Sequence, residues 1–193
     1  TKIFRPLGKA GSRKKLKLPV DGKIISYIGS IQKIQGVDIL IKTFESLKNE
    51  NKNIRLLIVG GLGTVVKENF DFKNDGIIYL GSIPQKNVVY AINASDVLVI
   101  PYPKNKFTEV MMAPYKIVEF LACNKPVVIT DVGEMHRLVK DNKIIAKAGN
   151  TRDLKEKIKY ALRVKKVNSR GIALKFDWKN IASKLNDTLM HIK

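Results

Sequence analysis

The chain has 193 residues, 45% of them hydrophobic, and its 36 basic and 17 acidic residues give a formal net charge of +19. This length and hydrophobic content fit one globular domain with a proper core and exclude a disordered protein. The single cysteine, Cys123, excludes an intramolecular disulfide and suits a reducing compartment, and no run approaches the roughly 18 apolar residues that a membrane span needs. We therefore expect a cytoplasmic protein.

The positive charge is spread along the whole chain instead of forming one block. Three interpretations stay open: a general bias of surface composition, an anionic ligand, and an anionic membrane or nucleic acid. Basic and aromatic residues are not interleaved as in single-strand binders, and the sequence has no zinc-finger or RNP-like motif, so we expect no nucleic-acid partner. A peripheral contact with the anionic inner face of a membrane stays open, since each basic group near such a surface contributes roughly 1 kcal/mol.

Short runs rich in β-branched and aliphatic residues alternate with segments of helical period. The predicted strands are 23–29, 53–60, 76–82, 95–101, 125–130 and 142–149. The predicted helices are 36–50, 84–94, 114–122, 132–140, 151–167 and 177–193. Six strands that alternate with helices predict a parallel sheet covered on both faces, in a Rossmann-like three-layer α/β/α sandwich. No long linker or internal repeat interrupts the pattern, so residues 1–193 are expected to form a single domain.

Local signals predict several helix boundaries. Ser12 is expected to cap a short helix near the start, and Thr151 to cap the helix over 151–167. Pro114 stands in the first turn of its helix, where the missing N–H has no partner to lose. Asn124 is expected to end the same helix in the left-handed conformation, as the second choice after glycine.

Candidate sites lie at the carboxyl ends of the strands, where such sheets bind ligands. Three segments come there: 29–36 (GSIQKIQG), 60–63 (GGLG) and the loop before Pro114. Glycines such as Gly29 and Gly60 permit tight turns and close approach of a phosphate, although glycine also ends strands for packing alone. Because GGLG is not G-x-G-x-x-G and no convincing acidic residue follows, the indication of a dinucleotide site is weak.

The helix that begins at Pro114 carries the most suggestive side chains. A helix N-terminus after a strand end is where α/β proteins hold phosphates. Lys116 and Glu119 are three residues apart and share one face. The Glu119 carboxylate can accept two hydrogen bonds from a ribose diol, or it can form an ion pair with Lys116 worth only tenths of a kcal/mol. The two histidines, His136 and His191, lack metal-ligand spacing, so we expect no metal site.

Five segments together carry a family resemblance: IISYIGSIQKIQGVDILIKTF, LLIVGGLG, IIYLGSIP, ASDVLVIPYP and PYKIVEFLACNKPVVITDVG. In this order they resemble the nucleotide-sugar-binding C-terminal domain of the retaining glycosyltransferases of group 1, which have two Rossmann-like domains in the GT-B architecture. FRP near the start and FDWKNIASKL near the end also match the borders of that domain. The resemblance implies that 1–18 corresponds to an interdomain linker, and that the helix over 177–193 packs toward a preceding acceptor-binding domain.

The resemblance also implies roles for two acidic positions. The second glutamate of the family's Glu-(seven residues)-Glu motif, which holds the donor ribose, maps onto Glu119. The first glutamate, which contacts the transferred sugar, falls on Met111, a departure from the motif. Glu109 lies two residues earlier and is the alternative candidate for this position.

For the diphosphate, the backbone N–H groups of Tyr115 and Lys116 match the segment that meets sugar and diphosphate. The family's diphosphate-neutralising Arg and Lys fall on Ser30 and Gln35, which leaves Lys33 as a nearby cation. Losing two charge-assisted contacts would cost about 1.5–3 kcal/mol each, unless Lys33 and Lys116 compensate. The donor-binding residues implied are Gly29, Ser30, Lys33, Gly60, Pro114, Tyr115, Lys116 and Glu119.

The function implied is that of a donor-substrate domain of a retaining, hexosyltransferase-like glycosyltransferase. It would transfer a sugar from a nucleoside-diphosphate sugar to a glycan or lipid-linked acceptor without a metal or other cofactor. The domain alone is expected to be inactive, because the acceptor domain is missing. The alternative is a non-catalytic nucleotide-binding or protein-interaction module, which the missing Arg and Lys favour.

Overall fold

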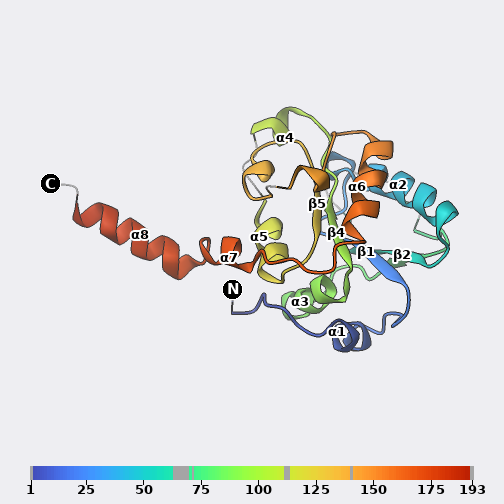
Figure 1. Ribbon diagram of the computed structural model, residues 1–193, viewed down its shortest axis with the longest axis horizontal. Coiled ribbons are helices and arrows are strands. Elements are labelled where there is room, and N and C mark those ends of the chain that lie inside the picture. Colours follow the sequence, from blue (N-terminus) through green and yellow to red (C-terminus); the bar gives the residue numbers. More distant parts are fainter. Residues whose placement is uncertain (1, 63–69, 71, 111–113, 140, 192–193) are drawn as a thin grey trace.

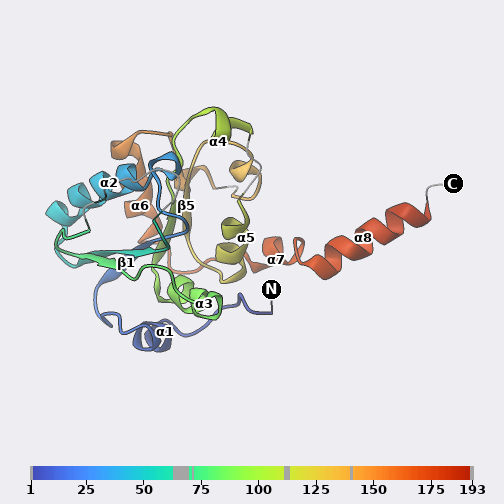
Figure 2. The ribbon, with the colours of Figure 1, turned by 180° about the vertical axis from the view of Figure 1, so that it is seen from behind.

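The structure is a computed structural model that describes residues 2–62, 70, 72–110, 114–139 and 141–191. This part of the chain forms one parallel sheet of six strands between two layers of helices (Figures 1 and 2). The strands are β1 (Lys23–Ile28), β2 (Ile54–Val59), β3 (Ile77–Tyr79), β4 (Val97–Ile100), β5 (Val127–Thr130) and β6 (Ile145–Ala146). Their order β3-β2-β1-β4-β5-β6 is that of Rossmann folds, so the predicted six-stranded α/β/α sandwich is confirmed.

Each face of the sheet is covered by its own set of helices. One face carries α2 (Val37–Glu50) and α6 (Thr151–Ala161), which contact each other. The other face carries α3 (Gln85–Ala94) and α5 (Tyr115–Ala122), with α1 (Lys9–Lys15) against α3 and α7 (Arg170–Leu174) against α5. The remaining helical segments are α4 (Lys106–Val110), α8 (Trp178–Met190) and the 3-10 turns η1 (Lys33–Gln35), η2 (Met135–Arg137) and η3 (Asn142–Ile144).

The position of β1 in the middle of the sheet explains why its sequence is almost continuously apolar. Ile24 and Ile28 belong to the core beneath α3 and α5, whereas Ile25 and Tyr27 belong to the core beneath α2 and α6. Successive side chains of a strand point to opposite faces, and here both faces are covered. The strand therefore needs apolar side chains at odd and even positions alike.

Two predicted elements in the last third differ from the structure. The helix predicted over 132–140 is wrong, because only Met135–Arg137 forms a 3-10 turn in its described part. Gly133 precedes this turn with φ +54°, a left-handed conformation that a right-handed helix cannot contain. The strand predicted over 142–149 is reduced to Ile145–Ala146. The Asp141 carboxylate accepts a hydrogen bond from the Lys143 N–H at 2.9 Å, and this local bond favours a turn over extension.

Two predicted caps are also wrong. Ser12 lies inside α1 instead of before it, and its hydroxyl donates to the Gly8 carbonyl at 2.9 Å. The cap of α6 is Asn150, one residue before Thr151, and its Oδ1 accepts from the Asp153 N–H at 3.0 Å. Asparagine ranks above threonine at this position, so a neighbouring asparagine takes the role.

The predicted end of α5 is confirmed, whereas its start lies one residue later than predicted, because Pro114 stands before the first turn and not within it. Pro114 is the N-cap residue, and the helix begins at Tyr115. Asn124 has φ +53°, the expected left-handed conformation after the helix end. Its side-chain oxygen accepts hydrogen bonds from the N–H groups of Ser169 and Arg170, at 3.0 and 2.7 Å. This asparagine therefore ends one helix and holds the start of α7.

The two ends of the chain differ in how they meet the sandwich. At the N-terminal end Arg13 is 1% exposed and forms an ion pair with Asp96, N to O 2.7 Å. At the other end α8 has no buried residue and projects away from the sandwich (Figure 1). Its exposed large apolar side chains are Trp178, Ile181, Leu185, Leu189 and Met190. No helix in the described residues is long and apolar enough to cross a membrane.

Candidate functional site

The turns that follow β1 and β2 pack backbone against backbone at the carboxyl edge of the sheet. Gly29 follows β1, and its N–H donates to the Val59 carbonyl at 2.9 Å. Gly60 follows β2, where an added Cβ would lie 1.8 Å from the Gly29 oxygen. A Cβ at Gly29 would lie 2.3 Å from Lys116 Nζ. Backbone contact therefore requires glycine after β2, whereas after β1 glycine is favoured by its φ of +150°, and the ammonium of Lys116 lies directly against it.

Lys116 brings a cation from the first turn of α5 to this edge. Its Nζ lies 3.3 Å from Gln35 Oε1 and 4.9 and 5.3 Å from the ring centroids of Tyr27 and Tyr102. Burial lowers the pKa of Lys116 to about 8, against the opposing effect of the Glu119 carboxylate. Both residues are described, yet no ion pair joins them, so the i,i+3 salt bridge considered from the sequence is not formed.

Tyr27 ties the first glycine turn to η1. Its hydroxyl oxygen lies 2.6 Å from the Ser30 carbonyl oxygen and 2.5 Å from Gln35 Oε1. Burial raises the pKa of Tyr27 well above its ordinary value, and burial raises that of Tyr102 to about 12. Both rings are therefore neutral at physiological pH, and they face the ammonium as neutral aromatic surfaces.

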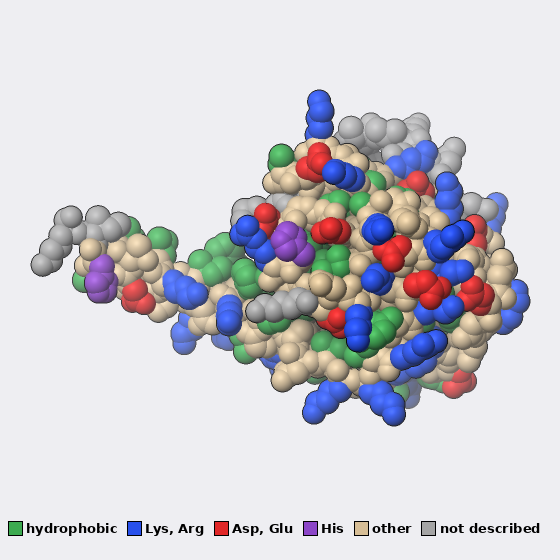
Figure 3. Space-filling view, turned by 45° about the horizontal axis from the view of Figure 1, so that its top comes forward, with side chains coloured by type: hydrophobic (Ala, Val, Ile, Leu, Met, Phe, Trp, Pro, Cys, Tyr) green, Lys and Arg blue, Asp and Glu red, His purple; other side chains and the backbone are tan. Residues whose placement is uncertain are grey.

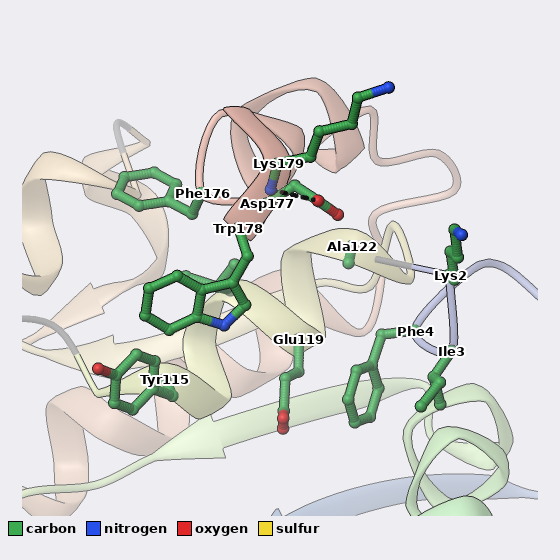
Figure 4. A pocket seen from close by; sticks show the side chains of 11 residues that line it. Lys2, Ile3, Phe4, Tyr115, Glu119, Ala122, Phe176, Asp177, Trp178 and Lys179 are labelled. Atoms are coloured by element: carbon green, nitrogen blue, oxygen red, sulfur yellow. Dashed lines mark hydrogen bonds between the residues drawn. The ribbon is translucent and has the colours of Figure 1, made fainter. Parts of the chain in front are cut away.

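Glu119 lies one turn further along α5 and faces different surroundings. It lines a cavity of about 550 Å³ together with Tyr115, and Figure 4 shows its carboxylate pointing into the space between Tyr115 and Phe4. Burial raises the pKa of Glu119, and the charge of Lys116 opposes this shift. The cavity is completed by residues near both ends of the described chain: Lys2, Ile3, Phe4, Phe176, Asp177, Trp178 and Lys179.

The other predicted residues are dispersed around this centre. Ser30 accepts from Gln32 Nε2 at 3.1 Å through its hydroxyl, and Lys33 is exposed on η1. Glu109 lies on α4, half-exposed, with Oε1 3.3 Å from Lys104 Nζ. Met111 lies outside the described residues. The structure thus brings together Gly29, Ser30, Gly60 and Lys116, and places Glu119 with Tyr115 at the neighbouring cavity.

Sequence reasoning missed the aromatic part of the site. In the sequence, Tyr27 is indistinguishable from the other buried positions of its strand, and Tyr102 belongs to the strand end IPYP. The alternation of β1 and the position of Tyr102 just after β4 are signals that could have placed both near the carboxyl edge. Both rings contact Lys116 because β1, η1, α5 and the segment after β4 pack together.

The described residues contain no group of three His, Cys, Asp or Glu side chains that could hold a metal ion. Figure 3 shows basic side chains scattered over the displayed face, with acidic ones between them. On this face the basic side chains do not form a single anion-binding patch.

The chain is 26% identical to the D-inositol 3-phosphate glycosyltransferase of Acidothermus cellulolyticus over 93% of this chain and 43% of that protein. The chain therefore spans less than half the length of this relative. Among solved structures it resembles Anabaena HepE in complex with UDP, with a TM-score of 0.82 and 18% identity over 99% of this chain and 55% of HepE.

A structure of one such domain by itself is also similar. The C-terminal domain of the glycosyl transferase group 1 family protein LpcC from Francisella tularensis gives a TM-score of 0.71 at 17% identity, over 93% of this chain and 97% of that domain. These likenesses establish the fold, one Rossmann-like half of the GT-B architecture. Residues 9–173 match the family described as Glycosyl transferases group 1. The chain belongs to this family.

Proposed function

We propose that the chain is the donor-substrate domain of a retaining glycosyltransferase, which transfers a sugar from a nucleoside-diphosphate sugar to a glycan or lipid-linked acceptor. The observation that carries the proposal is the Lys116 ammonium, held against the glycine turn after β1 at the carboxyl edge of a Rossmann-like sheet. Ligands of such sheets bind at this edge. The structures of Anabaena HepE with UDP and with UDP-glucose support a nucleotide sugar as the ligand.

In this proposal the diphosphate meets the N-terminus of α5. The first-turn N–H groups, including those of Tyr115 and Lys116, have no partner within the helix and would donate to an anion bound there. Gly29 and Gly60 let the backbone approach the phosphates, and Ser30 and Lys33 lie on the following segment. These dipoles and cations would stabilise the negative charge that grows on the leaving diphosphate, which is electrostatic catalysis without a metal.

Glu119 is proposed to hold the ribose of the donor. Its carboxylate opens into the cavity between Tyr115 and Phe4, where a diol could reach both oxygens (Figure 4). The transferred sugar would lie near Glu109 or Met111. Because Glu119 is partly buried, removing it would lose charge-assisted hydrogen bonds of about 1.5–3 kcal/mol each.

The acceptor is proposed to be bound by an N-terminal domain. The exposed apolar face of α8 and the cavity shared by the two chain ends are surfaces that such a domain would cover, with 1–18 as the linker-side segment. The 193-residue chain alone would then bind the donor without transferring sugar. We further propose a cytoplasmic location with peripheral contact to an anionic membrane surface, supported by the net charge of +19.

The second candidate is a non-catalytic nucleotide-binding or protein-interaction module. The uncharged Ser30 and Gln35, at the positions where the resemblance has Arg and Lys, favour it. Transfer activity of the full-length protein separates the two candidates. A protein that binds the nucleotide sugar tightly, yet neither transfers nor hydrolyses the sugar with any acceptor offered, supports the module.

Isothermal titration of UDP, GDP and UDP-glucose into the chain tests the donor site. We expect the chain to bind at least one of them. We expect Glu119→Ala to lower the affinity about tenfold or more, which follows from the hydrogen-bond energies above. Glu156→Ala is the matched control, because Glu156 is an exposed carboxylate on α6. Absence of binding at about 1 mM of every ligand, roughly −4 kcal/mol, would contradict the donor site. Equal affinity of Glu119→Ala and the parent would contradict the ribose role alone.

A further inference from the structure

The Lys116 ammonium is buried, and no acidic side chain of the described residues forms an ion pair with it. Among the described residues its neighbours are one amide oxygen, Gln35 Oε1 at 3.3 Å, and the faces of Tyr27 and Tyr102. Burial lowers the pKa of Lys116, and the charge that opposes this shift is that of Glu119 on the same helix, with which Lys116 forms no ion pair. A buried charge without a counter-ion is costly and is a common mark of a ligand site. The cation is thus held in place by groups that leave its charge uncompensated.

Gln35 is the hydrogen-bonding neighbour of this ammonium among the described residues. Its side-chain oxygen faces Lys116 Nζ and also lies 2.5 Å from the Tyr27 hydroxyl. Tyr27 is 0% exposed, and its hydroxyl is held 2.6 Å from the Ser30 carbonyl. A continuous array therefore runs from the turn after β1 through Tyr27 and Gln35 to the lysine. Because the amide is neutral, it orients the ammonium without cancelling its charge.

Gly29 keeps the space for this arrangement. A Cβ there would lie 2.3 Å from Lys116 Nζ, so any other residue would displace the ammonium. The same turn supplies backbone for an anion that approaches the carboxyl edge. The cation is therefore positioned at the point where the glycine turn and the N-terminus of α5 meet.

We propose that Gln35, oriented by Tyr27, is a positioning residue that holds the Lys116 ammonium beside Gly29 as a fixed cation for the donor diphosphate, and that a lysine at position 35 would take over this role from position 116. This inference rests on the proposed function, because it concerns the same diphosphate. The exchange of positions is suggested by the 3.3 Å contact, because a lysine side chain is one bond longer than glutamine and would bring its ammonium toward the place that Lys116 leaves.

A charge-relocation series tests the proposal with UDP and GDP as probes in calorimetry at pH 7. We expect Lys116→Met to weaken binding about tenfold to a hundredfold, the range for one charge-assisted hydrogen bond. The double variant Gln35→Lys/Lys116→Met is expected to recover most of that loss. Lys14→Met removes one exposed lysine of α1, far from this array, and is expected to bind like the parent.

The outcomes separate this inference from the proposed function. If the parent binds no nucleotide, the proposed function fails and the inference with it. Suppose that the parent binds a nucleotide and that the double variant binds it as weakly as Lys116→Met does. If the double variant also has the parent's circular dichroism spectrum and melting behaviour, a lysine at position 35 does not replace Lys116, and only the inference is overturned.

A second measurement distinguishes positioning from a merely structural role and does not depend on the double variant. Gln35→Glu adds a carboxylate beside the ammonium, so it should raise the pH at which Lys116 titrates. This titration is measured by mass spectrometry, as the pH dependence of Lys116 acetylation. Gln35→Glu should also weaken UDP binding about tenfold, because the cation is now neutralised. An unchanged titration of Lys116 in Gln35→Glu would overturn the contact on which the proposal is built. Tyr27→Phe is expected to weaken binding by a smaller factor.

Discussion

Gly60→Ala tests whether the packed glycine turns determine both stability and binding. The new Cβ would lie 1.8 Å from the Gly29 oxygen, whereas ordinary contacts begin near 3.4 Å. The turns after β1 and β2 would have to separate by about 1.6 Å (3.4 minus 1.8 Å). Their strands are paired along their whole length, from Lys23 with Ile54 to Ile28 with Val59, so this separation has to break pairing at the strand ends.

We expect Gly60→Ala to lower the free energy of unfolding by about 2–4 kcal/mol, from overpacking and from the strain of a residue with a side chain at φ +148°. Urea denaturation followed by circular dichroism measures this. UDP binding is expected to weaken too, because a moved Gly29 displaces the Lys116 ammonium. Gly61→Ala is the matched control, since its Cβ would meet only the Ser82 hydroxyl, at 2.8 Å, and that side chain can rotate away. Equal stability of the two variants would refute the reasoning.

Three further predictions concern charge and the C-terminal helix. Asp96→Asn is expected to lower the free energy of unfolding by about 3–5 kcal/mol in urea denaturation, because it leaves the buried guanidinium of Arg13 without its ion-pair partner. In the parent, the Ile24 N–H and the cations of Lys9 and Arg13 outweigh burial and lower the pKa of Asp96, so its contribution to stability is lost as pH falls through that lowered pKa. For Lys116 the sign is opposite: its folded pKa of about 8 lies below its ordinary value, so the unfolded chain binds more protons between the two. Stability should therefore rise from pH 8 toward pH 10 in thermal melts, and less so in Lys116→Met. Leu185→Ser on α8 should change the unfolding free energy of this chain by less than about 0.5 kcal/mol, because the side chain is 58% exposed; a larger loss would mean that α8 packs within the chain.

Much of the fold follows from local sequence because its signals are strong and repeated. The apolar runs of β1 and β2 can only be satisfied by burial on both faces. The proline and asparagine at the two ends of α5 act through their own backbone preferences, so they needed no tertiary context. Two of the errors arose where neighbouring side chains competed for one backbone N–H, as Asn150 did with Thr151, and where a short segment had only two residues to pair.

The candidate site, like the fold, could be predicted from the sequence only in part. Spacing along one helix was enough to select Lys116 and Glu119, because residues three apart share a face. Spacing could not show that they do not pair, that Lys116 turns to Gln35 and two tyrosine rings, or that Glu119 opens into a cavity formed by both chain ends.

The sequence by itself thus determined the α/β class, the six strands and the helix that presents the basic and acidic groups, since these depend on period, composition and local backbone preference. The tertiary structure alone decided which groups meet: Lys116 lies 81 residues from Gln35 in the chain, and it reaches Gln35 and Tyr27 because the parallel strands end at one edge. There the ammonium lies against Gly29, where no side chain occupies its place.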